Sequence, residues 1–217
     1  LKIAPTIIIL SLLVTHYSSL AFASTTWTET TDTNFNDGIY YLTKTSGTGT
    51  GAQLTLDWRG TGADGSVSIT ANKNINTDTI ALGRTYADGV NYSVTGIGTD
   101  YVTTGATPNG IDVGDEVILI NMQGTSSDYS NVGNYEFLRV ASISGNNIYF
   151  TTDIQKTYGT PASQKIVVQR VPQYGDVTID GATLTCSAWD GTKGGLLVFR
   201  ATGTVTVESG AVSYTHL

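Results

Sequence analysis

Apolar residues occupy every second position in several stretches of this chain, and no ten-residue stretch after residue 23 has apolar residues at helical spacing. The segment 54–58 alternates in this way, and after a Gly-rich turn Val67 and Ile69 continue the pattern. A period of two places successive side chains on opposite faces of a strand. The sequence therefore predicts an all-β fold with little helix, and it predicts a hairpin over residues 53–71.

The clearest predicted strands lie between residues 112 and 170. Residues 117–120 form a continuous apolar run, which is typical of a strand buried on both faces. Residues 135–143 form a longer strand, and Gly145-Asn146 fits a two-residue turn into the next strand at 148–150. Consecutive strands joined by short loops predict a small antiparallel barrel or sandwich.

From residue 173 onward the apolar segments become very short. Residues 177–179, 184–185, 196–199 and 205–207 are separated by glycine-containing corners, and the strand starts are spaced loosely at about ten residues. This pattern favours the start of a β-solenoid of the right-handed β-helix type, in which each strand covers one side of a coil. Additional sandwich strands are the alternative.

The first 23 residues have the organisation of a signal peptide. Lys2 supplies a positive charge, residues 7–14 are apolar, and Ala21-Phe22-Ala23 fits a cleavage site. The apolar run is shorter than the roughly 20 residues that a membrane-spanning helix needs. We expect cleavage before Ser24, export to the extracellular space or cell surface, and no membrane span in the mature protein.

These patterns divide the chain into five expected segments. They are a signal peptide at 1–23, an N-terminal β-rich region at 24–110, an antiparallel meander or barrel-like domain at 111–172, the start of a β-solenoid at 173–212, and a non-native tail at 213–217 that resembles a translated sequencing adapter.

Composition excludes several classes of function. The net charge is −7 and Lys and Arg form no cluster, whereas a nucleic-acid-binding protein needs a basic surface. His16 lies in the predicted signal peptide, His216 lies at the end, and no histidine lies between them. The single cysteine, Cys186, is expected to be a small buried residue. We therefore expect no cofactor and no transition-metal site.

Several acidic residues are candidates for catalytic or metal-binding groups. Residues 32–38 resemble a calcium loop, but glycine and glutamate are missing from the required positions, although loosely bound calcium at other loops stays open. Asp115 and Glu116 are adjacent on a strand, so they should point to opposite faces, and a solvated strand end is the favoured interpretation. Turn roles are expected for the remaining acidic candidates, which are Asp176, Asp180 and Asp190. No catalytic, cofactor-binding or metal-binding residue is assigned.

A glycine-rich segment and the aromatic residues are two further patterns for which a structural role is favoured. The glycine-rich segment 47–51 lacks the lysine and the following helix of a phosphate loop. Trp27, Trp58 and Trp189, with 12 tyrosines, could stack on sugars, but filling β-sheet cores is the favoured role.

Five stretches carry a resemblance to a known group of proteins. They are residues 114–121, 133–140, 168–174, 188–195 and 199–205. Together they resemble the N-terminal region of large secreted bacterial surface proteins, adhesin-like or associated with gliding motility. Those proteins continue into Gly-rich, β-solenoid-like segments and lectin-like modules. The resemblance covers about residues 112–210 and assigns no functional residue.

The resemblance and the lack of catalytic residue types imply the same kind of function. We expect a secreted or cell-surface structural or adhesive module, not an enzyme, that forms the N-terminal part of a longer protein. Its expected partners are surface glycans or other cell-surface proteins, and nucleic acid is not among them. The alternative is the N-terminal accessory region of a polysaccharide-active β-helix enzyme whose active site lies beyond residue 217.

Overall fold

The computed structural model describes residues 27–29, 42–44 and 60–214, and all regular secondary structure among them is β-strand. The chain divides into two compact units, residues 1–58 and 59–217. In the first unit β1 (Trp27–Glu29) pairs antiparallel with β2 (Leu42–Lys44). The all-β prediction is confirmed. The described residues include no apolar helix of the length that a bilayer crossing needs.

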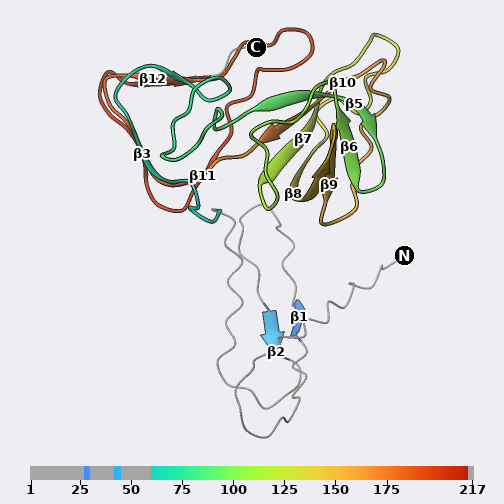
Figure 1. The fold of residues 1–217 in the computed structure, drawn as a ribbon, viewed down its shortest axis with the longest axis horizontal. Coiled ribbons are helices and arrows are strands. Elements are labelled where there is room, and N and C mark those ends of the chain that lie inside the picture. The colour runs from blue at the N-terminus through green and yellow to red at the C-terminus, as the bar shows by residue number, and fades with distance from the viewer. Residues whose placement is uncertain (1–26, 30–41, 45–59, 215–217) are drawn as a thin grey trace, which may run out of the picture. The chain divides into compact units, whose positions relative to one another are not determined.

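Six strands of the second unit form a closed antiparallel barrel in the order β10-β5-β6-β9-β8-β7 (Figure 1). They are β5 (Asn91–Ile97), β6 (Tyr101–Thr104), β7 (Glu116–Gln123), β8 (Tyr135–Ser144), β9 (Asn147–Phe150) and β10 (Lys165–Arg170). The turn predicted at Gly145-Asn146 is confirmed, because Ser144 pairs with Asn147 and Gly145 has a φ of 58°. A positive φ at this position suits glycine and matches the twist of a two-residue hairpin.

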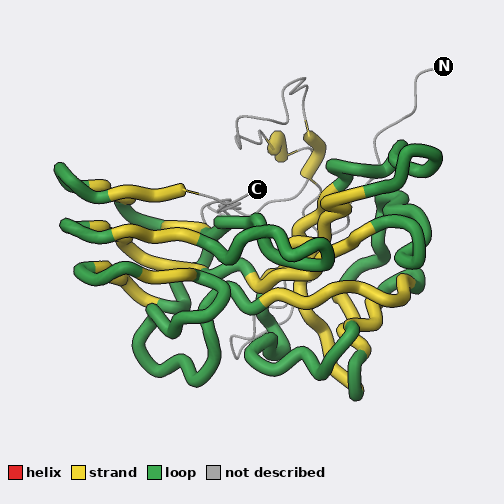
Figure 2. The backbone as a smooth tube through the Cα atoms, turned by 90° about the horizontal axis from the view of Figure 1, so that it is seen from above, coloured by secondary structure: helices red, strands yellow, loops and turns green. Residues whose placement is uncertain are grey.

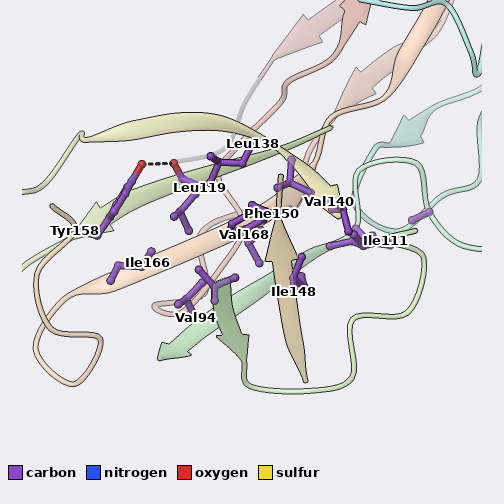
Figure 3. Packing of buried hydrophobic residues seen from close by; sticks show 14 residues of the cluster. Val94, Ile111, Leu119, Leu138, Val140, Ile148, Phe150, Tyr158, Ile166 and Val168 are labelled. Carbon is purple, nitrogen blue, oxygen red and sulfur yellow. Dashed lines mark hydrogen bonds between the residues drawn. The ribbon is translucent and has the colours of Figure 1, made fainter. Parts of the chain in front are cut away.

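Every second side chain of a barrel strand points inward, and these inward side chains fill the barrel interior. On β8 Leu138 and Val140 are buried, whereas Phe137 between them is exposed. Inward side chains from all six strands form one cluster. Figure 3 shows Leu138, Phe150 and Val168 close together in it, with Tyr158, from the loop before β10, at one side. The Tyr158 hydroxyl donates a hydrogen bond to the Leu119 carbonyl over 3.3 Å, so its polar end is satisfied inside the apolar core.

The other part of the second unit consists of parallel strands in three stacked layers (Figure 2). The first layer contains β3 (Gly65–Ile69) and β4 (Lys73–Asn74), the second contains β11 (Gln173–Ile179) and β12 (Thr183–Thr185), and the third contains β13 (Arg200–Ala201), β14 (Val205–Val207) and β15 (Val212–Tyr214). Such in-register parallel stacking is the pairing that successive coils of a solenoid have.

The register aligns apolar residues of the three layers. Val177 pairs with Val67 on one side and with Val205 on the other. Val67 and Val177 are 7% and 0% exposed, but Val205 in the outer layer is 48% exposed. The second layer is therefore buried between its two neighbours, whereas the outer face of the third layer is covered by no described strand.

The hairpin predicted for residues 53–71 stays a prediction. Residues 53–59 lie outside the described residues, and β3 pairs in parallel with β11, about a hundred residues further along the chain. Alternation indicates which face of a strand is buried, but it does not indicate the partner strand.

The order of the parallel layers and the barrel along the chain differs from the expected order of segments. The first parallel layer precedes the barrel in the chain, so the barrel is an insertion between the first and second layers. Strands β5 and β6 lie before the boundary expected at residue 110, yet both belong to the barrel. Cys186 is buried among the apolar side chains of the layers, as expected. Ser213 and Tyr214, which we placed in a non-native tail, pair with β12 as part of β15.

Candidate functional site

Two groups of polar side chains are candidates for function, and the first joins the barrel to the parallel layers. We call it the ion-pair joint; it consists of Asp64, Asp115, Glu116, Arg170 and Arg200. Asp64 precedes β3, Arg170 ends β10 and Arg200 begins β13, so the joint includes the first layer, the barrel and the third layer.

The interpretation of Asp115 and Glu116 as a solvated strand end is wrong. Their side chains are only 14% and 16% exposed. Arg170 Nε lies 2.9 Å from Asp115 Oδ2, and Arg200 Nε lies 2.5 Å from Glu116 Oε2. The two arginines come from β10 and β13, and no local sequence pattern predicts these distant partners.

Arg170 is the most buried member of the joint. Its Nη2 donates to both carboxylate oxygens of Asp64, over 2.8 and 3.1 Å, and its Nη1 donates to the Asp88 carbonyl over 3.1 Å. Burial by itself lowers the pKa of Arg170, but the bonds to Asp64 and Asp115 outweigh this effect and raise it. A buried charge is tolerated only when it is paired in this way.

Gln173 and Tyr174, at the start of β11, continue this polar network. The Gln173 backbone N–H donates to Asp64 over 2.6 Å, and its side chain donates to Glu116 over 2.8 Å. The Tyr174 hydroxyl donates to the buried carboxylate of Asp88 over 2.7 Å. Burial, and then the charge of Asp88, raises the pKa of Tyr174 above its ordinary value. The carboxylates at this joint are therefore engaged in bonds that fix the fold.

The second group lines a polar hollow of about 220 Å³. The wall contains residues from the loop after β4, from the start of β5 and from the loop between β12 and β13. The lining residues are Asn76, Thr77, Asn91, Ser187, Ala188, Asp190, Lys193 and Gly194.

Side-chain amides fix the floor of the hollow. Asn76 accepts a hydrogen bond from the Ser187 backbone N–H over 2.9 Å and donates to the Gly89 carbonyl and to Gln169 Oε1, over 2.7 and 3.1 Å. The fully buried Gln169 side chain donates in turn to the Leu196 carbonyl over 3.3 Å. The floor thus links the first layer, barrel strand β10 and the loop 186–199.

A tight turn shapes the rim. Asp190 Oδ1 accepts from the Thr192 N–H, the Thr192 hydroxyl and the Lys193 N–H, over 2.7, 2.6 and 2.9 Å. The hydrogen bond from the Thr192 hydroxyl, followed by the one from the Lys193 N–H, lowers the pKa of Asp190 below its ordinary value. Gly194 has a φ of 97°, and any side chain there would collide with the Ala188 carbonyl. The turn therefore depends on glycine at this position.

Trp189 anchors the same loop on the barrel. Its indole N–H donates to Gln123 Oε1 on β7 over 3.0 Å, and the residue is half-buried. Of the three tryptophans considered for sugar stacking, Trp189 alone has a described side chain. Trp27 lies in β1, where side chains are not described, and Trp58 lies outside the described residues.

The remaining sequence candidates do not gather into a site. Asp176 accepts a hydrogen bond from the Thr204 N–H over 2.8 Å, and Asp180 lies in the turn after β11. Among the residues that the structure describes, no three His, Cys, Asp or Glu side chains come together as metal ligands would. The segments 32–38 and 47–51 and both histidines lie outside the described residues.

Sequence reasoning did not select Asn76, Asn91, Gln169 or Lys193, which shape the hollow. They come from loops and strands up to 117 positions apart, and the local sequence around each one marks it only as an ordinary polar residue. The local signals are the segments 168–174 and 188–195, which contain Gln169 and Lys193 and carry the resemblance to surface proteins.

No protein-family model and no curated protein sequence matches the chain. Three solved structures to which part of this chain is similar are all phage tailspikes. The tailspike gp49 of Pseudomonas phage LKA1 is 17% identical with a TM-score of 0.29, and the match covers 57% of this chain and 23% of that chain. The tailspike gp61 of Pseudomonas phage phi297 is 20% identical with a TM-score of 0.27, covering 57% and 19%.

The third structure is the Gp54 tailspike of Acinetobacter baumannii bacteriophage AP22, in complex with A. baumannii capsular saccharide. It is 17% identical with a TM-score of 0.32, and the match covers 69% of this chain and 28% of that chain. The chain thus corresponds to less than a third of each tailspike, and likenesses at these TM-scores carry no inference about function.

Proposed function

We propose that this chain is an extracellular structural or adhesive module without catalytic activity, and that it forms the N-terminal part of a longer surface protein. The observation that carries the proposal is the ion-pair joint. Asp64, Asp115 and Glu116 are paired with arginines that tie the barrel to the first and third layers. Carboxylates that are paired in this way hold the barrel rigidly on the parallel layers, as a structural module requires.

The exposed outer layer supports continuation into further coils. Val205 and Val207 of β14 are 48% and 50% exposed, although their register partners in β11 are buried. A further parallel strand on β14 would bury these side chains and satisfy the backbone groups at that edge. The accessory region of a β-helix enzyme with a distant active site is the alternative, and the downstream sequence distinguishes the two. Gly-rich repeats or lectin modules favour the adhesive module, whereas clustered Asp with Arg or Lys on successive coils favours the enzyme.

Export rests on the features of residues 1–23. We expect the secreted protein to begin at Ser24, and mass analysis of its N-terminus tests this. Exported protein that keeps Leu1 would contradict the assignment of a signal peptide.

The adhesive role is tested in the organism that carries the gene. Deleting residues 60–214 from the full-length protein should reduce attachment of cells to glycan-coated surfaces while the protein still reaches the surface. Purified chain incubated with the same glycans should release no new reducing ends. Release that is abolished by Asp115→Asn or Asp190→Asn would overturn the non-catalytic assignment.

A further inference from the structure

We propose that the hollow described above binds one neutral sugar ring, held by Asp190, Lys193 and Asn91. The proposal rests on the proposed adhesive function for its biological setting and on the geometry of the hollow for its chemistry. At about 220 Å³ the hollow lies below the roughly 300–1,000 Å³ of ordinary ligand pockets. Its size therefore suits one ring of a glycan rather than a longer oligosaccharide.

The hollow offers unused hydrogen-bonding groups of both kinds. Asp190 Oδ1 takes all three bonds within the turn, and among the described residues no hydrogen bond is made to Asp190 Oδ2. In the same part of the chain the Lys193 ammonium makes no hydrogen bond and no close ion pair, although its charge acts on Asp190. Asn91 uses only its Nδ2, over 3.4 Å to Gln169. A carboxylate oxygen accepts hydrogen bonds, an ammonium donates them, and the Asn91 carbonyl oxygen accepts one more.

This combination selects the class of ligand. A divalent cation such as calcium needs six or more oxygen ligands. The hollow offers one carboxylate, and the ammonium of Lys193 beside it would repel a cation. A phosphate or another multiply charged anion would be repelled by Asp190. Adjacent hydroxyls on a sugar ring donate to a carboxylate and accept from an ammonium at the same time, so a neutral polyol uses both charges.

The site is also formed before any ligand arrives. Three hydrogen bonds fix Asp190, and the bond from Ser187 N–H to Asn76 fixes the opposite side of the loop. Gly194 gives the turn a conformation that other residues rarely adopt. A preorganised site loses little conformational entropy on binding, which favours recognition of a small, weakly binding ligand.

The test is a titration of the full mature chain, followed by amide NMR signals, with glucose, galactose, N-acetylglucosamine and glucuronate added separately. We expect saturable shifts, with at least one of the three neutral sugars, at the amides of Asn91 and residues 191–195. Asp190→Asn keeps an oxygen for the turn but removes the charge, and Lys193→Met keeps the backbone N–H but removes the ammonium. Each should weaken binding about tenfold, as loss of a charged hydrogen bond does.

Matched controls separate this site from general effects. Asp180→Asn and Lys156→Met change the same residue types outside the hollow and should leave the affinity unchanged. Binding of glucuronate alone, or shifts that do not saturate or do not respond to Asp190→Asn and Lys193→Met, would overturn the proposal. If cells carrying these two substitutions still attach and no sugar binds in the hollow, the sugar-site proposal is wrong but the proposed adhesive function stands.

Discussion

Arg170 Nη2 lies 2.8 Å from Asp64 Oδ1, although 106 positions separate the two residues in the sequence. Arg170 ends the last barrel strand, and Asp64 comes just before the first parallel strand. The pair therefore fastens the point where the chain leaves the barrel to the point where the parallel layers begin. Both side chains are almost fully buried, so removing one partner should destabilise the fold far more than breaking a surface ion pair does.

Replacing Arg170 should destabilise the fold. Arg170→Met leaves the buried Asp64 and Asp115 without their cation, and breaking such a pair costs about 3–5 kcal/mol. Urea unfolding of the mature chain measures the loss. Adding Asp64→Asn to the variant should restore part of it, because one uncompensated charge is removed. The control is Arg139→Met at an exposed arginine on β8, and an equal loss there would show that burial of the joint is not the cause.

Truncating one valine in each of two paired strands should have unequal effects. Val177→Ala removes a fully buried side chain between two layers and should lower the free energy of unfolding by about 2 kcal/mol. Its register partner Val205 is half-exposed, and Val205→Ala should cost less than about 0.5 kcal/mol. Denaturant midpoints of the two variants test the difference. Equal costs would mean that another part of the chain covers the third layer.

The exposed edge of the third layer should promote self-association. Val205, Val207 and Val212 are each about half-exposed on strands that pair on one side within the described residues. Sedimentation of residues 24–217 should show association that grows with concentration. The double variant Val205→Lys/Val207→Lys should stay monomeric because charges on an edge oppose strand pairing. A monomeric parent whose β14 amides are protected from hydrogen exchange would show that the edge is already covered.

Stability should fall in alkaline solution because of two tyrosines. Burial, followed by the carboxylates of Glu136 and Asp88, raises the pKa of Tyr158 and Tyr174 in the folded protein. Below about pH 10 both states keep these protons, and above it only the unfolded state releases them. The free energy of unfolding should therefore decrease from about pH 10 upward, by up to about 1.4 kcal/mol per pH unit for each tyrosine.

Unfolding by denaturant at several alkaline pH values measures this slope. Tyr158→Phe should make the slope shallower, whereas Tyr129→Phe, at an exposed position, should not change it. An unchanged slope in Tyr158→Phe would contradict the assignment to that residue. Absorbance of the ionised phenol in the folded protein provides an independent count of the tyrosines that titrate late.

Local patterns predicted the strands well where turns were short. The run at 117–120, the long strand at 135–143 and the turn at Gly145-Asn146 all correspond to β7, β8 and the connection to β9. In each case the information lies within a few residues, because period-two alternation and turn chemistry are local properties. The candidate hollow could not be predicted in this way, since its Asn91 and Lys193 come from segments far apart in the sequence.

The sequence by itself determined that the chain is all-β, that strand residues 65–69 and 177–179 each bury one face, and that Cys186 is buried. Only the tertiary structure decided that β3 pairs with β11 across the whole inserted barrel, and that Asp115 and Glu116 have arginine partners. The physical reason is that burial preference is encoded one residue at a time. Pairing between distant segments depends on which edges and charges the folded chain brings within a few ångströms of one another.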